Sequence, residues 1–158
     1  CIATTISLEN LSTSIIATDI SKEALSIAKE NSQKFNVKNI DFKIHDFLNT
    51  DINSIFDVVV SNPPYIGSDE MDALQKEVQD YDPKIALTDN DDGLSFYRRF
   101  SELGASLLNE NGYMLLELGG SHQVVAISEI FESHQLNVKF HNDLQGNPRI
   151  VEVNLLTQ

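Results

Sequence analysis

The 158-residue sequence has one cysteine, no long apolar run and few basic residues, and each scarcity excludes a class of protein. Cys1 has no second cysteine to pair with, so an internal disulfide is excluded and a reducing compartment, the cytoplasm, is favoured. Apolar runs such as Val58-Val59-Val60 are far shorter than the about 20 residues of a membrane-spanning helix. The opening residues lack the basic segment and apolar stretch of a secretion signal.

Basic side chains are scarce, because 11 Lys and Arg face 24 Asp and Glu and give a net charge of −13. Nucleic-acid affinity depends largely on Lys and Arg that neutralise phosphates, so no direct nucleic-acid binding is predicted. The imbalance is strongest over residues 69–92, where nine acids accompany only Lys76 and Lys84. We interpret this segment as a solvated acidic loop; the alternative is that it repels polyanions from a neighbouring site.

The sequence also lacks paired metal ligands and linkers. The four histidines, His45, His122, His134 and His141, have no pair at metal-ligand spacing, so no metal site is predicted. Hydrophobic residues make up 41% and charged residues 22%, which is typical of a globular protein. Because there is no repeat or Gly/Ser-rich linker, a single domain over residues 1–158 is predicted.

Apolar spacing predicts helices and strands that alternate along the chain. Strand 56–61 is expected to be fully buried, residues 62–92 to be irregular, and Gly112 to separate a helix from the next strand. The alternation predicts an α/β fold with a doubly wound, mostly parallel sheet and an antiparallel C-terminal hairpin, as in Rossmann-like nucleotide-type methyltransferases. Predicted helices cover 2–8, 21–35, 93–109 and 121–134, and predicted strands cover 14–18, 40–45, 56–61, 113–118, 137–142 and 149–156.

Polar residues follow three of the predicted strands, where ligands bind in open α/β sheets. Asp19 ends the first strand and can accept hydrogen bonds from two ribose hydroxyls. It can equally help Ser21 to start the next helix. Asp46 follows the second strand and can accept from an adenine amine while Phe47 packs on the ring; taken alone, an ordinary turn aspartate is the better interpretation.

The third strand is followed by Asn62-Pro63-Pro64-Tyr65, the most specific signal in the sequence. An amide or aromatic amine nitrogen is a weak nucleophile, because its lone pair is delocalised. The Asn62 side-chain carbonyl and the Pro63 backbone carbonyl can hold its two N–H groups, in a turn that consecutive prolines stiffen. Tyr65 supplies a flat face against a planar group. A plain β-turn is the alternative and is less favoured at the end of a buried strand.

With these residues the sequence resembles the HemK-type protein-(glutamine-N5) methyltransferases, which modify peptide chain release factors. The resemblance extends over essentially the whole chain, and residues 81–87 carry Asp82 where the family more often has Glu. The matching motifs are Ala17-Thr18-Asp19-Ile20-Ser21, Ser61-Asn62-Pro63-Pro64-Tyr65-Ile66, Asp92-Gly93-Leu94, Leu115-Leu116-Glu117-Leu118-Gly119, and Asp143-Leu144-Gln145-Gly146 with Arg149.

The resemblance implies transfer of a methyl group from S-adenosylmethionine to a glutamine side chain of a release factor. It implies that Asn62, Pro63 and Tyr65 are catalytic, and that Pro64 joins them in binding the substrate. Glu117 and Arg149 match family positions, with structural pairing as their expected role. The implied cofactor-binding residues are Asp19, Ile20, Asp46, Phe47 and Asn62.

The family also binds the methionine part of its cofactor with a Gly-rich loop between the first strand and helix. Here the first glycine is Gly67, and Cys1 lies where the family has just left that loop. The first strand, which is central in the family's sheet, the loop and an N-terminal helical domain are therefore expected to be missing, as in a truncated protein.

Two other functions stay open. The Asn-Pro-Pro-Tyr motif is shared by DNA adenine and ribosomal RNA guanine methyltransferases, so an exocyclic base amine, flipped out of its stack, is the alternative acceptor. The later motifs and the acidic charge favour glutamine. The third possibility is a binding module that has kept the fold and lost the cofactor.

Overall fold

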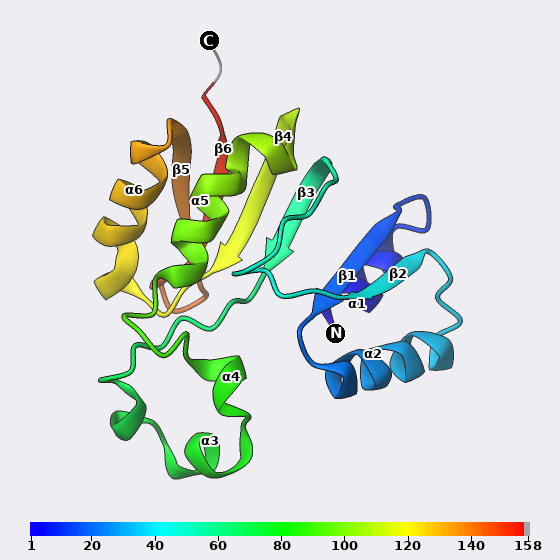
Figure 1. Cartoon of the computed structure of the whole chain (residues 1–158), viewed down its shortest axis with the longest axis horizontal. Helices are drawn as coiled ribbons and strands as arrows, with labels where there is room; N and C mark the ends of the chain where they lie inside the picture. The colour runs from blue at the N-terminus through cyan, green and yellow to red at the C-terminus, as the bar shows by residue number, and fades with distance from the viewer. Residues whose placement is uncertain (157–158) are drawn as a thin grey trace. The chain divides into compact units, whose positions relative to one another are not determined.

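The structure is a computed structural model that describes residues 1–156 (Figure 1). The chain divides into two compact units, residues 1–51 and residues 52–158, and each is described by itself. No helix in the described part of the chain is both long enough and apolar enough to cross a bilayer.

Unit 1 contains two helices and a two-stranded parallel sheet. Its elements are α1 (Ile2–Glu9), β1 (Ile15–Asp19), α2 (Lys22–Lys34) and β2 (Ile40–Ile44). Ser21 caps α2 as predicted, since its hydroxyl accepts a hydrogen bond from the Ala24 amide at 3.1 Å. In the parallel register Asp19 lies opposite Ile44. The loops that follow β1 and β2 therefore begin at the same edge of this sheet.

Unit 2 contains a four-stranded sheet. Its strands, in spatial order, are β3 (Phe56–Ser61), β4 (Leu108–Glu117), β6 (Pro148–Leu155) and β5 (Leu136–Asn142). β3 is parallel to β4, whereas β6 runs antiparallel to both β4 and β5. The predicted C-terminal hairpin and the α/β fold class are confirmed. In chain order, the elements of unit 2 are β3 (Phe56–Ser61), η1 (Met71–Ala73), α3 (Lys76–Tyr81), α4 (Lys84–Leu87), α5 (Ser95–Leu107), β4 (Leu108–Glu117), η2 (Ser121–Gln123), α6 (Val124–Ser133), β5 (Leu136–Asn142) and β6 (Pro148–Leu155).

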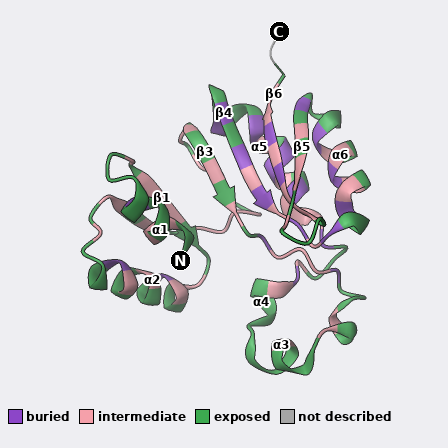
Figure 2. Ribbon diagram, turned by 180° about the vertical axis from the view of Figure 1, so that it is seen from behind, coloured by how far each residue is buried: buried purple, intermediate pink, exposed green. Residues whose placement is uncertain are grey.

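The core of unit 2 lies between this sheet and helices α5 and α6, where Figure 2 shows most of the buried residues. Met114 and Leu116 on β4 are fully buried and two positions apart, so both point to the same face of the sheet. Helices α5 and α6 contact each other and the sheet. Their buried side chains include Tyr97, Phe100, Leu107, Ile127 and Phe131.

Three sequence predictions were wrong. β3 is not fully buried, because among the described residues it pairs with β4 alone, at an edge of its sheet, and Val58 is 42% exposed. Residues 62–92 include the three short helices η1, α3 and α4 instead of a wholly irregular path. β4 begins at Leu108, and an irregularity in its pairing with β3 accommodates Gly112 inside the strand instead of ahead of it.

Candidate active site

The Asn62-Pro63-Pro64-Tyr65 turn lies directly after β3, at the carboxyl end of the parallel β3–β4 pair. Ser61 is in register with Leu116, so the turn and the end of β4 occupy the same edge of the sheet. Asn62 is exposed, and its side-chain amide has no hydrogen-bond partner among residues 1–156. Pro63 is buried beside it. The Asn62 side-chain amide is thus accessible and lies in a segment that the prolines stiffen. Both properties suit a residue that binds the methyl-accepting group of a substrate.

Tyr65 closes the turn and faces the end of β4. Its hydroxyl donates to Glu117 Oε1 at 3.4 Å. Burial raises the pKa of Tyr65, the negative charge of Glu117 raises it further, and Arg149 opposes both. The hydroxyl therefore stays protonated at neutral pH. A Cβ placed on Gly119 would lie 3.2 Å from the Tyr65 ring, so glycine at this position gives the ring its room.

Glu117 and Arg149 make contacts that are structural. The Glu117 backbone carbonyl accepts the hydroxyl of the fully buried Tyr97 at 2.6 Å. Arg149 Nη1 donates to the backbone carbonyls of Leu118 and Gly119 at 3.1 and 3.3 Å. These bonds fix the loop after β4 opposite the Tyr65 ring.

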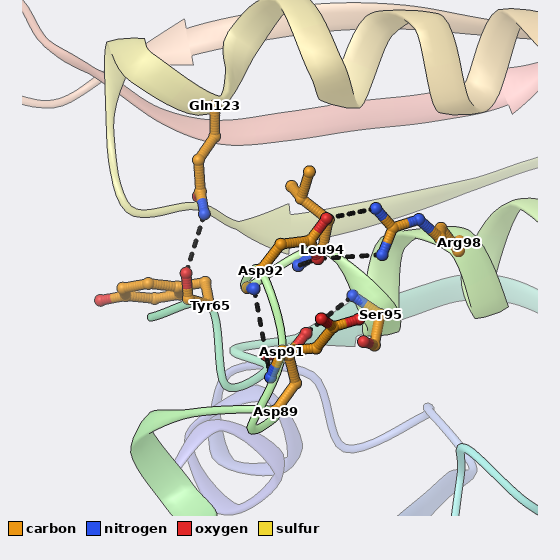
Figure 3. A network of polar contacts seen from close by, with 9 residues as sticks. Tyr65, Asp89, Asp91, Asp92, Leu94, Ser95, Arg98 and Gln123 are labelled. Carbon is orange, nitrogen blue, oxygen red and sulfur yellow. Dashed lines mark hydrogen bonds and ion pairs between the residues drawn. The ribbon is translucent and has the colours of Figure 1, made fainter. Parts of the chain in front are cut away.

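A second loop, residues 88–95, lies beside the chain that follows the turn (Figure 3). The Ile66 amide donates to the Leu87 carbonyl at 3.1 Å, and the Ser68 amide donates to the Asp91 carbonyl at 2.8 Å. The Asp89 carboxylate organises this loop by accepting hydrogen bonds from three backbone amides. The donors are Asp91 at 2.9 Å, Gly93 at 3.0 Å and Ser95 at 2.9 Å.

Charge is stabilised within this second loop. Partial burial acts to raise the pKa of Asp89, but hydrogen bonds from Ser95, Asp91 and Gly93 outweigh it, and the pKa lies below its ordinary value. Arg98 donates to both oxygens of Asp92, and that pairing lowers the pKa of Asp92. Both carboxylates are therefore ionised at neutral pH. The sequence did not predict the role of Asp89. It is one of several acids in this segment, and no sequence pattern indicates that its carboxylate accepts hydrogen bonds from backbone amides.

Asp19 and Ile20 lie in unit 1, at the end of β1, and both are exposed. The Asp19 carboxylate accepts one hydrogen bond, from the Ser21 amide to Oδ1 at 2.8 Å. The helix-start role is thus present, and it leaves the second oxygen, Oδ2, open to a ligand.

Asp46 and Phe47, also in unit 1, follow β2 and are partly buried. The Asp46 carboxylate accepts from the backbone and side chain of Asn49 at 3.2 and 2.9 Å, which is the pattern of a turn aspartate. Phe47 packs edge-on against His45, with ring centroids 6.4 Å apart. Within residues 1–156, the buried His45 Nε2 has no hydrogen-bond partner.

These groups fit an adenosine. Asp19 offers an open carboxylate oxygen for ribose hydroxyls, and Asp46 retains accepting capacity for an amine, since each carboxylate oxygen has two lone pairs. Phe47 supplies an apolar ring, and His45 adds an unpaired buried nitrogen beside it. The described residues contain no cluster of three or more potential metal ligands.

Residues 3–118 match the model of a protein family described as Eco57I restriction-modification methylase. A bifunctional methyltransferase of Rickettsia prowazekii is 39% identical over 156 residues, which cover 97% of this chain and 30% of the relative. A release factor glutamine methyltransferase of Bacillus subtilis is 37% identical over 153 residues, which cover 95% of this chain and 53% of the relative. The chain thus spans about a third to a half of the curated relatives it matches. These relatives confirm the HemK-type resemblance.

The fold is also found in solved structures. A methyltransferase from Pyrococcus furiosus superposes with a TM-score of 0.67 at 18% identity. The superposition covers 96% of this chain and 68% of that one. This likeness supports the α/β fold that the alternation of helices and strands predicted.

Proposed function

We propose that this chain, which belongs to the Eco57I restriction-modification methylase family, methylates a glutamine in a peptide chain release factor. The methyl group is transferred to the side-chain amide nitrogen. The observation that carries this proposal is the Asn62-Pro63-Pro64-Tyr65 turn, with its exposed and unpaired Asn62 amide, at the carboxyl end of β3. Identity of 37% to a release factor glutamine methyltransferase supports the choice of acceptor.

In this proposal the turn binds the target amide. The Asn62 side-chain oxygen and the Pro63 backbone oxygen each accept one of its N–H groups, and Tyr65 packs on its plane. Holding both N–H groups orients the nitrogen lone pair toward the methyl donor. With S-adenosylmethionine bound, the oriented nitrogen would accept the methyl group, and the amide would lose one N–H proton to solvent. Alignment, more than a strong base, lowers the barrier.

The cofactor is held by unit 1 residues in this proposal. Bound S-adenosylmethionine supplies an electrophilic methyl group on a positively charged sulfur. Asp19 accepts from its ribose, with Ile20 beside it, and Asp46 and Phe47 receive the adenine. Asn62 also belongs to the proposed cofactor-binding set.

Charge favours a protein over a nucleic acid as the substrate. Residues 69–92, which follow the turn, contain nine acids and two lysines. A phosphate backbone that approached this turn would meet repulsion, whereas basic groups near a glutamine on an exposed loop would be attracted. A release factor works with the ribosome, so a cytoplasmic location is part of the proposal.

The second candidate is an N-methyltransferase that acts on the exocyclic amine of a DNA or RNA base. The match of residues 3–118 to a restriction-modification methylase family favours it. Such an enzyme must flip its base into the turn and bind the backbone with positive charge. With 11 basic and 24 acidic residues, this chain is poorly suited to that task.

Mass spectrometry of a release factor after incubation with the protein and S-adenosylmethionine tests the proposal. A mass increase of one methyl group on a peptide that contains a single glutamine is expected. Fragmentation must place it on the glutamine side chain. A release factor that stays unmodified while another acceptor is methylated would count against glutamine as the substrate.

A further inference from the structure

Gln123 lies at the junction of η2 and α6 and is 5% exposed. Its side chain leaves the helix and reaches the catalytic turn (Figure 3). Nε2 donates to the Tyr65 backbone carbonyl at 2.8 Å, and Oε1 accepts from the Gly119 backbone amide at 2.9 Å. A carbonyl can only accept and an amide N–H can only donate, so these two partners fix the orientation of the Gln123 amide group.

The same Tyr65 carbonyl is approached by the second loop. A Cβ placed on Gly93 would lie 2.4 Å from that oxygen, and Gly93 has a φ of +78°. Only glycine fits such a close approach in this conformation. Asp89 fixes the position of Gly93 by accepting its amide hydrogen bond at 3.0 Å. The Tyr65 carbonyl is therefore bonded by Gln123, and the backbone of Gly93 packs closely against it.

We propose that Gln123 is a positioning residue, which ties the Asn62–Tyr65 turn to the end of β4 and holds its acceptors in the geometry for methyl transfer. The assignment of methyl transfer to this turn rests on the proposed function; the tie itself rests on the contacts alone. The Asn62 and Pro63 oxygens belong to residues three and two positions before Tyr65, in a segment that the two prolines stiffen. A shift of the Tyr65 carbonyl is therefore transmitted to both acceptors.

Gln123→Glu separates the two hydrogen bonds. The glutamate keeps the shape and can still accept from Gly119, but an ionised carboxylate cannot donate to the Tyr65 carbonyl and repels it. We expect the kcat for release factor methylation to fall about 10- to 100-fold, because small misplacements of reacting groups are costly. The affinity for S-adenosylmethionine should change less than twofold.

Acid restores the donor in this variant. Burial and a facing carbonyl raise the pKa of a glutamate at position 123, and the protonated form can donate again. The ratio of variant to wild-type kcat should rise as the pH is lowered from 8 toward 5.5. Gln123→Met, which has neither donor nor acceptor, should lose activity without this recovery. Gln33→Glu makes the same chemical change on the exposed surface of α2 and should match wild type throughout.

Hydrogen–deuterium exchange of the full chain gives a readout that does not depend on the substrate. Exchange of residues 62–68 should accelerate in Gln123→Glu and Gln123→Met, while β5 and β6 stay protected. Without the bond from Gln123 to the Tyr65 carbonyl, the Ile66 and Ser68 amides should separate more often from the Leu87 and Asp91 carbonyls. Wild-type exchange in 62–68 together with a wild-type pH profile of kcat would overturn the inference, as would uniform acceleration across unit 2 with an unchanged kcat. If exchange changes as expected but no glutamine is methylated even by wild type, the positioning stands and the proposed function fails.

Discussion

Asn62 is exposed, and its side-chain amide has no partner among residues 1–156, so it is free to bind a substrate. If that amide orients the acceptor nitrogen, Asn62→Ala should lower kcat by about 100- to 1,000-fold, the usual cost of losing one preorganised hydrogen-bonding group. Cofactor affinity should fall by much less than kcat, because Asp19 and Asp46 still bind the adenosine in the proposal. Single-turnover kinetics and calorimetry measure the two quantities separately, and near-normal turnover would remove Asn62 from the mechanism.

Asp19 offers one free carboxylate oxygen after its bond to the Ser21 amide. Asp19→Ala should weaken S-adenosylmethionine binding by about 1–3 kcal/mol, if two ribose hydrogen bonds are lost. Asp19→Asn is the matched variant, because its side-chain oxygen can still accept from Ser21 and start α2. Calorimetry of both variants decides the role of Asp19. Equal, undiminished affinity in both would return it to the start of the helix.

At the scale of elements, the loop 88–95 approaches the Asn62–Tyr65 turn at Gly93, where a Cβ would lie 2.4 Å from the Tyr65 carbonyl oxygen. In Gly93→Ala the new Cβ would clash with the Tyr65 carbonyl and the residue would keep an unfavourable φ. Gly146→Ala is the matched control, since Gly146 has a φ of +88° and a Cβ added there would meet nothing within 4 Å. In both variants, an alanine at positive φ should lower the free energy of unfolding by about 1 kcal/mol. Only Gly93→Ala adds a clash with the Tyr65 carbonyl.

Urea unfolding should therefore give a larger loss of stability for Gly93→Ala than for Gly146→Ala, and only the former should lose methyl transfer. Equal losses of stability, with activity kept in both, would show that the close approach to Tyr65 does not matter.

Two carboxylates of the same loop, Asp89 and Asp92, make the free energy of unfolding depend on pH in the acid range. The pKa values of Asp89 and Asp92 are lowered in the folded state from an ordinary value of 3.8. Their contribution to the free energy of unfolding is therefore complete above the unfolded pKa and is lost as the pH falls below it, through the folded pKa. Asp89→Asn should be less stable than wild type at pH 7, and the gap should narrow below pH 4. Unfolding curves at both pH values measure this, and a gap that widens in acid would contradict it.

Tyrosine ionisation acts at the other end of the pH scale. Burial raises the pKa of Tyr65 and of Tyr97, and the charge of Glu117 adds to both shifts. The stability that these hydroxyls contribute is present below pH 10, the ordinary value, and is lost as the pH rises through the higher folded pKa values.

For the whole molecule, the sequence predicted whatever depends on periodicity. Apolar spacing predicted helix α5 and the strands of the C-terminal hairpin. Polar groups at the ends of β1, β2 and β3 indicated the candidate site residues. The helices of residues 71–87 were missed, because they have only three to six residues each and no apolar stripe. The early start of β4 was missed, because pairing with β3 overrides the polar sequence Asn109-Glu110-Asn111-Gly112.

Part of the site could not be predicted for a related reason. Gln123 follows Ser121 and His122 in a polar start to a helix, and nothing local indicates a contact with Tyr65, 58 positions away. Asp89 is one of several acids whose partners are backbone amides that any sequence would supply. Contacts of this kind are set by tertiary structure alone, so only the folded chain reveals which residues hold the turn.

A glutamine, and not a nucleic-acid base, is the proposed acceptor of the methyl group. The direct test offers S-adenosylmethionine labelled on its methyl group to the protein in one mixture with a release factor, DNA and ribosomal RNA. We predict that the label enters the release factor alone, and that it disappears when the target glutamine is replaced. Label in DNA or RNA, with the release factor unmodified, would contradict the account and favour the base methyltransferase.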